Sequence, residues 1–262
     1  MSYDLVVCGA SITKDKAWST WATFVKEHYH WNSVHDISNH GSGNELIVTH
    51  TIATASKLKN PFIAVMLTTF DKWDWVTDDL TKLARFDKEK NPICYLDTNL
   101  GAWGTGSHYP LDKAHYKEEY YCQDWMTIRN LQSINYLVLY CKANNIPFIL
   151  LNDSPIFNTI EEYLNKGIVN NINLVNKKTK LYRELIYYTF YEPGLIGYAE
   201  EHNMPWRHGK FGTHPGSMVH WAFVNDVVIP GLAQYNLTEK KNFGNLHEQF
   251  ITDQKVWDET NE

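Results

Sequence analysis

The chain has 262 residues, a formal net charge of -6 and 44% hydrophobic side chains. This length suits one α/β layer structure with insertions, and the apolar content is sufficient for a sizeable core. The acidic balance argues against a general polyanion binder, because phosphate binding needs a concentrated basic face. We therefore expect no nucleic-acid partner.

The amino terminus shows no targeting pattern. Residues 1–4 contain neither a basic region nor a long apolar segment, and no stretch approaches the roughly 18 uninterrupted apolar residues of a membrane helix. We therefore expect no signal peptide and no membrane partner. The cysteines, Cys8, Cys94, Cys122 and Cys141, lack close metal-ligand spacing. Cys8 and Cys141 stand in apolar contexts, which predicts buried thiols in a cytoplasmic protein, or in a virion-associated protein made in a reducing cytosol.

Strands and helices alternate along the first part of the chain. Residues 3–8 form a short apolar run that predicts a strand, and residues 17–29 have the apolar spacing of a helix. Residues 34–37 predict a weak strand and residues 45–58 a helix. Residues 61–67 give the clearest signal for a buried strand.

The same alternation returns further along the chain. Residues 120–144 predict a long helix that stops before Pro147, residues 146–151 a strand, and residues 178–191 another helix. Repeated strand, helix and strand with short apolar strands indicates a parallel sheet covered on both faces. The sequence therefore predicts an α/β fold, a three-layer α/β/α sandwich with a central parallel sheet.

We interpret residues 1–236 as one domain with insertions at about 77–124 and 157–176. Glycines and prolines punctuate the first insertion, and a loop of this length in a compact domain is either functional or disordered. Its aromatic residues favour an ordered cap between the third and fourth strands. Residues 237–262 form a polar tail, for which we expect a contact with a partner subunit of a homo-oligomer.

Three short segments carry residues typical of nucleophilic catalysis. Ser11 ends the first apolar run, which places it at the carboxyl edge of the predicted sheet, where open α/β folds build their sites. His214 could supply the base. Gly43 follows the second predicted strand, and backbone amides there could form an oxyanion site. Structural alternatives are a helix-capping serine, a loop histidine held by Pro215, and a helix-entry turn at Gly43.

Together these segments resemble the SGNH, or GDSL-like, hydrolase family and indicate a divergent member of cellular or viral origin. The family's first block, usually Gly-Asp-Ser, appears as Gly9-Ala10-Ser11, and its second as residues 39–43. The last block appears as His214-Pro215 with His220 six positions after the first histidine. The resemblance covers the chain from residue 9 to about 232 and implies the SGNH-hydrolase-like, flavodoxin-like fold.

The resemblance implies an esterase that needs no cofactor. Ser11 would attack the carbonyl carbon, His214 would accept and return the proton, and the amides of Ser11 and Gly43 would hold the oxyanion. The aromatic loops favour an O-acetylated carbohydrate as the small ester substrate, ahead of lipid or thioester.

Two positions depart from the family's pattern. Phe70 stands where the oxyanion-hole asparagine is expected, so that a hydroxyl of Thr68 or Thr69, or a bound water, would replace the missing donor. Phe211 stands at the place of the acid that orients the imidazole. A Ser-His dyad held by a backbone carbonyl is one solution. Four side chains are candidates for the missing third group: His208, Glu200, Glu201 and Asp153.

The same departures favour a second hypothesis, an SGNH-fold protein that has lost catalysis and serves as a carbohydrate-binding or structural, virion-associated module. The twelve histidines do not indicate a metal site. His28, His30, His35 and His40 straddle a helix end, a strand and a loop, and no His-x-x-x-His pair shares a helix face.

Overall fold

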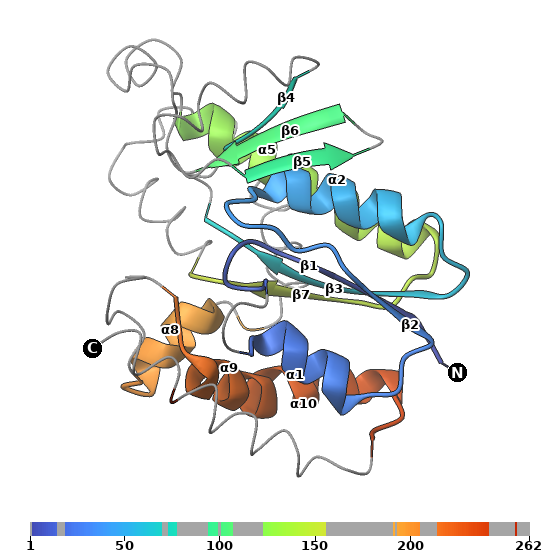
Figure 1. Ribbon diagram of the computed structural model, residues 1–262, viewed down its shortest axis with the longest axis vertical. Coiled ribbons are helices and arrows are strands. Elements are labelled where there is room, and N and C mark those ends of the chain that lie inside the picture. Colours follow the sequence, from blue (N-terminus) through green and yellow to red (C-terminus); the bar gives the residue numbers. More distant parts are fainter. Residues whose placement is uncertain are drawn as a thin grey trace.

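A four-stranded parallel sheet forms the centre of the computed structural model, in the order β2-β1-β3-β7 (Figure 1). Its strands are β1 (Asp4–Cys8), β2 (Ser33–Asp36), β3 (Pro61–Leu67) and β7 (Phe148–Asn152). The structure describes residues 2–14, 19–69, 73–77, 94–98, 101–106, 123–155, 191, 193–204, 214–240 and 255. The predicted α/β character and the parallel central sheet are confirmed.

The register of the sheet brings the ends of its strands together. Cys8 pairs with Val65, and Leu67 pairs with Asn152, in parallel ladders. The carboxyl ends of all the strands therefore meet at the same edge, where open α/β folds place their sites. Polar residues that follow β1, β2, β3 and β7 are consequently neighbours.

Helices cover both faces of this sheet (Figure 1). One face carries α2 (Asn44–Ala55) and α5 (Gln123–Ala143). The other carries α1 (Trp21–His28), α8 (Gly194–Glu201) and α9 (Ser217–Phe223), which continues into the short elements η1 (Val224–Val228), α10 (Ile229–Leu232) and η2 (Ala233–Tyr235).

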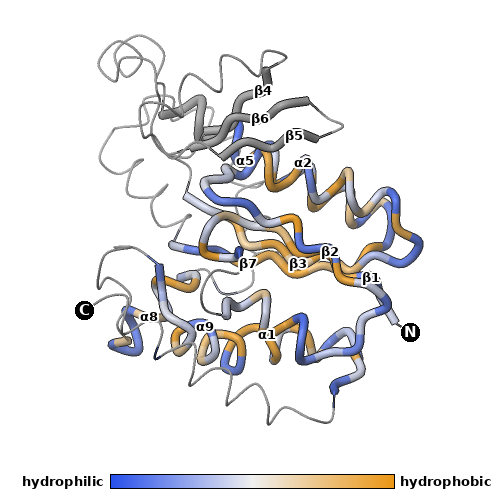
Figure 2. Tube along the Cα trace, viewed as in Figure 1, coloured by the Kyte–Doolittle hydropathy of each residue, from blue (hydrophilic) through white to orange (hydrophobic). Residues whose placement is uncertain are grey.

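The two faces of each strand belong to different cores, because successive side chains of a strand point to opposite sides. Leu5 and Val7 join the core beneath α1 and α9, whereas Val6 and Cys8 join the core beneath α2 and α5. Figure 2 shows this as hydrophobic colour along the strands and on the helices beside them. Every residue of β3 is buried, as expected for a central strand covered on both sides.

A second, antiparallel sheet has the order β4-β6-β5. It consists of β4 (Trp73–Thr77), β5 (Cys94–Thr98) and β6 (Gly101–Gly106). Two of these strands lie inside the insertion expected at about 77–124, where no strand was predicted. Glycine weakens strands and commonly marks turns, so the glycines of β6 make this segment look like a turn in the sequence.

Other expected segments extend beyond the described residues. The insertion at 157–176 lies outside them, as does nearly all of the helix expected at 178–191. Of the polar tail, residues 237–240 and 255 are described, and residues 237–240 run beside the end of α1. There Glu239 forms an antiparallel bridge with Tyr29, and the Lys240 N–H donates to the His28 carbonyl at 2.8 Å.

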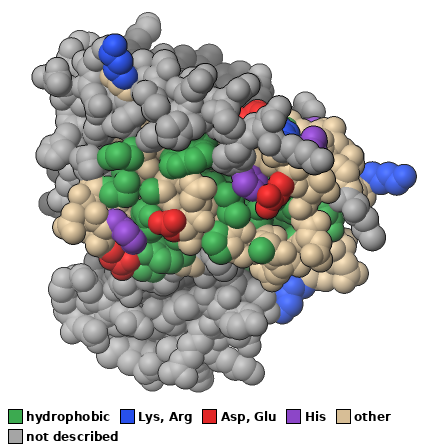
Figure 3. Space-filling view, turned by 90° about the horizontal axis from the view of Figure 1, so that it is seen from below, with side chains coloured by type: hydrophobic (Ala, Val, Ile, Leu, Met, Phe, Trp, Pro, Cys, Tyr) green, Lys and Arg blue, Asp and Glu red, His purple; other side chains and the backbone are tan. Residues whose placement is uncertain are grey.

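The layer of α1, α9 and α10 is seen from outside in Figure 3. Apolar side chains gather in the middle of its described surface, with histidine and acidic side chains among them. Trp221 and Ile229, which are partly buried against the core, belong to this layer. Over the described part of the chain, no helix combines the length and apolarity that crossing a membrane requires.

Candidate active site

Ser11 lies in a tight turn directly after β1. The Ala10 carbonyl accepts hydrogen bonds from the N–H groups of Thr13 and Lys14, at 3.0 and 3.2 Å. A side chain at Gly9 would place its Cβ 2.7 Å from Thr13 Cβ and 3.1 Å from the Met66 carbonyl oxygen. Only glycine fits there, and the close packing holds the turn against the end of β3.

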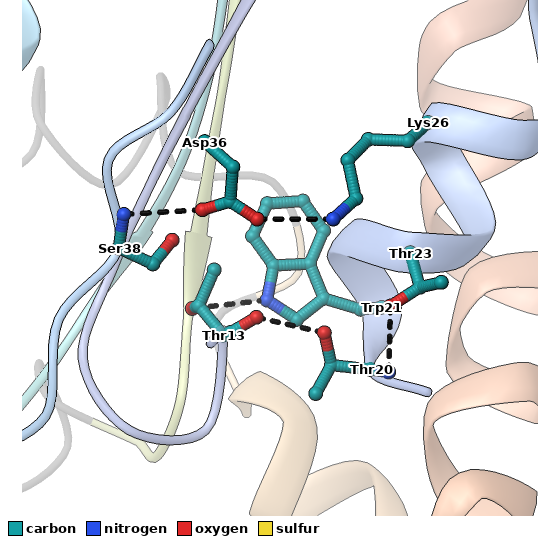
Figure 4. Close-up of polar contacts among 7 residues, drawn as sticks. All are labelled: Thr13, Thr20, Trp21, Thr23, Lys26, Asp36 and Ser38. Atoms are coloured by element: carbon teal, nitrogen blue, oxygen red, sulfur yellow. Dashed lines mark hydrogen bonds and ion pairs between the residues drawn. The ribbon is translucent and has the colours of Figure 1, made fainter. Parts of the chain in front are cut away.

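The start of α1 anchors this turn (Figure 4). The Trp21 indole N–H donates to Thr13 Oγ1 at 3.1 Å, and the Thr20 hydroxyl donates to the Thr13 carbonyl at 2.7 Å. The same view shows α1 tied to the end of β2 by an ion pair between Lys26 and Asp36 at 3.0 Å. The loops after β1 and β2 therefore share one rigid support.

Ser11 and His214 meet at this edge of the sheet. His214 Nε2 lies 2.8 Å from Ser11 Oγ, and both residues are half-buried. This distance is within the hydrogen-bonding range that a general base needs to take the proton of a serine hydroxyl. The structure thus brings together the two residues that the sequence predicts as nucleophile and base.

The start of α9 sets the position of His214. Pro215, Gly216 and Ser217 are buried, and Gly216 is the N-cap residue of α9. The Ser217 hydroxyl donates to the Ser19 carbonyl at 3.1 Å. Because Ser19 is followed by Thr20, the N-cap residue of α1, this bond fixes the histidine segment to the same support as the Ser11 turn.

Gly43 is the buried N-cap residue of α2 and lies at the same edge. The loop before it is joined to the Ser11 turn, because the Asn39 N–H donates to the Gly9 carbonyl at 3.1 Å. Gly41 has a φ of 74°, in the left-handed region that favours glycine. The N-terminus of a helix attracts negative charge, so Gly43 occupies a suitable position for an oxyanion contact.

A buried polar network crosses the same edge beyond Gly43. The Asn44 side chain accepts from the Thr68 N–H at 2.9 Å and donates to the Thr68 carbonyl at 2.8 Å. The Thr68 hydroxyl donates to Asp153 Oδ2 at 2.7 Å, and the Ser154 hydroxyl donates to the other carboxylate oxygen at 2.7 Å. Asn44, Thr68 and Asp153 are all buried.

The network also joins α2 to α5. Asn44 of α2 donates to Asn130 Oδ1 of α5 at 2.8 Å. The neighbouring residue of each helix adds an ion pair, between Glu45 of α2 and Arg129 of α5. Sequence analysis assigned no role to Asn44. The available signal was a polar residue at the first helical position, where a side chain can still reach the ends of neighbouring strands.

The remaining predicted residues occupy different places. Thr69 is half-buried and directly follows Thr68, whereas Glu200 and Glu201 are exposed on α8. The Tyr191 hydroxyl donates to Glu201. His220 is buried on α9. Three positions used in the sequence argument lie outside the described residues: Phe70, His208 and Phe211.

Two other histidines are buried away from these contacts. Burial lowers the pKa of His50 on α2. Burial also lowers the pKa of His28 at the end of α1, although the nearby Glu239 carboxylate acts in the opposite direction. Among the described residues, no group of three or more histidine, cysteine or acidic side chains could hold a metal ion.

Comparison of the chain with protein families, with curated proteins and with solved structures gives no match.

Proposed function

We propose that this protein is a serine hydrolase of carboxylic esters with an SGNH-hydrolase-like, three-layer α/β/α fold. The observation that carries the proposal is the 2.8 Å separation of Ser11 Oγ and His214 Nε2 at the carboxyl edge of a parallel sheet. The bond from the Ser217 hydroxyl to the Ser19 carbonyl and the anchored turn at Thr13 support it, because both restrict the pair to one geometry.

In the first half of the reaction, Ser11 Oγ forms a bond to the carbonyl carbon of the ester while its proton passes to His214 Nε2. The carbonyl π pair moves onto the oxygen and gives a tetrahedral oxyanion. When that pair returns, the bond to the alcohol oxygen breaks, and the leaving oxygen takes the proton from His214. The alcohol departs, and the acyl group remains on Ser11.

In the second half, His214 Nε2 takes a proton from water as the water oxygen attacks the acyl carbon. The new tetrahedral oxyanion collapses, the bond to Ser11 Oγ breaks, and the imidazole returns its proton to Ser11. The carboxylic acid is released, and the starting protonation state is restored. No external oxidant, reductant or cofactor enters this balance.

The oxyanion would be held by the backbone amides of Ser11 and Gly43. Supporting this role, Gly43 is the N-cap of a twelve-residue helix, where the partial positive charge of the helix end favours an anion. The acidic side chain in the first turn, Glu45, would oppose that effect, but Arg129 is paired with it.

We propose an O-acetylated carbohydrate as the substrate class. The support is compositional: aromatic residues are frequent in the segment from Trp73 to Tyr121, and aromatic rings commonly pack on sugar rings. An acetyl group needs no broad apolar cleft, and so the ester carbonyl could reach Ser11 while the sugar contacts the surrounding chain.

A fluorophosphonate probe tests the proposal, because such probes modify only activated serines. We expect labelling of Ser11 in the native protein, with hydrolysis of an activated acetyl ester that rises with pH as the imidazole loses its proton. Ser11→Ala and His214→Ala should both abolish labelling and turnover. Ser56→Ala, at an exposed serine at the end of α2, is the matched control and should retain both.

One rival function belongs to another class, a carbohydrate-binding or structural module without catalysis. It is favoured by the phenylalanines at positions 70 and 211, where the resemblance leads us to expect catalytic groups. A native protein that resists the probe and leaves acetyl esters intact, yet binds an acetylated glycan in calorimetry, would support the rival and overturn the hydrolase.

A further inference from the structure

Asn44 holds both polar groups of one backbone residue. Its side-chain oxygen accepts from the Thr68 N–H at 2.9 Å, and its side-chain nitrogen donates to the Thr68 carbonyl at 2.8 Å. A single buried amide thus fixes the peptide units on either side of Thr68. Because Asn130 accepts a further hydrogen bond from the same Asn44 nitrogen, the amide cannot rotate without losing its contacts.

The two hydrogen bonds from Asn44 to Thr68 determine the direction of the next backbone donor, the Thr69 N–H. The peptide bond between Thr68 and Thr69 is planar, and in the trans form its C=O and N–H groups point in opposite directions. With the Thr68 carbonyl turned toward Asn44, the Thr69 N–H is directed away from Asn44. No described residue accepts a hydrogen bond from that N–H.

The hydroxyl of Thr68 is committed elsewhere. Its one hydrogen is donated to the Asp153 carboxylate at 2.7 Å, and Thr68 is fully buried. A hydroxyl carries only one donor, so this group has none left for a substrate oxygen. Of the two threonines considered as substitutes for the missing asparagine, Thr69 is the half-buried one.

The turn that carries Ser11 lies next to the end of β3, the strand that leads to Thr68 and Thr69. Cys8, the last residue of β1, pairs with Val65 of β3. Gly9 also packs against the Met66 carbonyl, which keeps the turn after β1 next to the end of β3.

The geometry points to Asn44 as a positioning residue that aims the Thr69 backbone N–H at the oxyanion, as a third donor beside Ser11 and Gly43. This inference rests on the proposed hydrolase function. It replaces the side-chain amide expected at position 70 with a main-chain donor, whose strength does not depend on the residue type at position 69.

The test compares an ester with its thionoester, in which sulfur replaces the carbonyl oxygen. Sulfur is a weak hydrogen-bond acceptor, so the thionoester gains little from an oxyanion donor. In Asn44→Ala we expect kcat for the oxygen ester to fall about 10- to 100-fold with little change in KM, since one donor is misaligned. The thionoester rate should fall much less.

Thr51→Ala is the matched control, because it removes another buried side-chain hydrogen bond of α2, the bond to the Ile47 carbonyl, and leaves all the contacts of Asn44 in place. It should retain the wild-type ratio of ester to thionoester rates. If Asn44→Ala does not fold, a backbone ester at Thr69, which replaces the N–H by oxygen and keeps the side chain, gives the same comparison. In this backbone-ester variant, the rate for the oxygen ester should fall much more than the rate for the thionoester.

Each result decides the inference. Equal losses for the two substrates in Asn44→Ala or in the Thr69 backbone ester, or no loss, would overturn it while the hydrolase stands. A wild-type protein that is inert to the fluorophosphonate and to both esters would overturn the proposed function and this inference together.

Discussion

The Trp21 indole donates its N–H to the Thr13 hydroxyl at 3.1 Å, and Thr13 is the residue against which Gly9 packs. This contact links a fully buried tryptophan of α1 to the turn that carries Ser11. The nucleophile therefore depends on the first helix as well as on the strand that precedes it. Two of the predictions below follow from this link.

Trp21→Phe retains a large ring but removes the donor to Thr13. We expect the free energy of unfolding to fall by about 1–3 kcal/mol, because the buried Thr13 hydroxyl loses a partner. Labelling of Ser11 by the fluorophosphonate should also slow. Denaturant unfolding and labelling kinetics measure the two effects.

Trp31→Phe is the control for this prediction. Trp31 donates its indole N–H to the Val25 carbonyl at 3.2 Å, a bond of the same kind at the other end of α1. Trp31→Phe should lower the free energy of unfolding but leave the rate of Ser11 labelling unchanged. If both variants slow labelling equally, the effect is one of general stability, and the Trp21 contact has no particular role at the site.

Gly9→Ala adds a methyl group where no room exists. The new Cβ would meet the Thr13 side chain and lie 3.1 Å from the Met66 carbonyl oxygen. We expect a loss of about 1–3 kcal/mol in the free energy of unfolding, as for other overpacked sites, together with loss of Ser11 labelling. Unchanged stability and labelling would contradict the packing described for this turn.

The stability of the fold should decrease on mild acidification because of His50. Burial lowers its pKa in the folded protein, so below the ordinary value near 6.5 the unfolded chain binds a proton that the folded chain does not. The contribution of neutral His50 to the free energy of unfolding is complete above that pH. It declines as the pH falls toward the pKa that His50 has in the folded protein. Each unit of lowering corresponds to about 1.4 kcal/mol.

His50→Leu should flatten this pH dependence of the free energy of unfolding. The His50 Nε2 is buried and has no hydrogen-bond partner among the described residues, so its replacement by a similar apolar side chain should cost little stability at pH 7. Ser56→Ala, at an exposed residue just after α2, leaves His50 in place and is the control that should follow the wild-type curve. An equal slope for His50→Leu and wild type would refute the assignment.

Cys141 should resist alkylation while the protein is folded. Burial raises the pKa of its thiol to about 12, and its side chain is fully buried on α5. The reactive thiolate is therefore scarce and inaccessible at pH 8. Peptide mapping after iodoacetamide treatment should find Cys141 modified only in urea. Ser56→Cys supplies an exposed thiol for comparison; similar native rates at the two positions would contradict the burial.

The elements with strong apolar patterns could be predicted from sequence. The boundaries of β3 agree with the prediction, and those of β1, α2 and α5 agree within a few residues, because their burial produces periodicity. The glycine-containing strand β6 was missed, as was α8, which begins at a glycine with a φ of 70°. Such residues read as loop signals, and only tertiary pairing reveals the element.

The site was predictable where chemistry coincides with a motif. Ser11 and His214 were identified because each follows or precedes an apolar element at a recognisable spacing. The role of Asn44 was not predictable, because its partners Thr68 and Asn130 are 24 and 86 residues away. Nothing local distinguishes an asparagine that clamps a distant backbone from one that starts a helix.

Ser11 and His214 are separated by 203 positions in the chain. During synthesis the serine emerges well before the histidine, so until His214 has been made no base is available to activate the nucleophile. A nascent chain, or one truncated before α9, therefore carries the serine without its partner. Hydrolytic activity of this pair would report completion of the domain, and partial products would be harmless to esters around them.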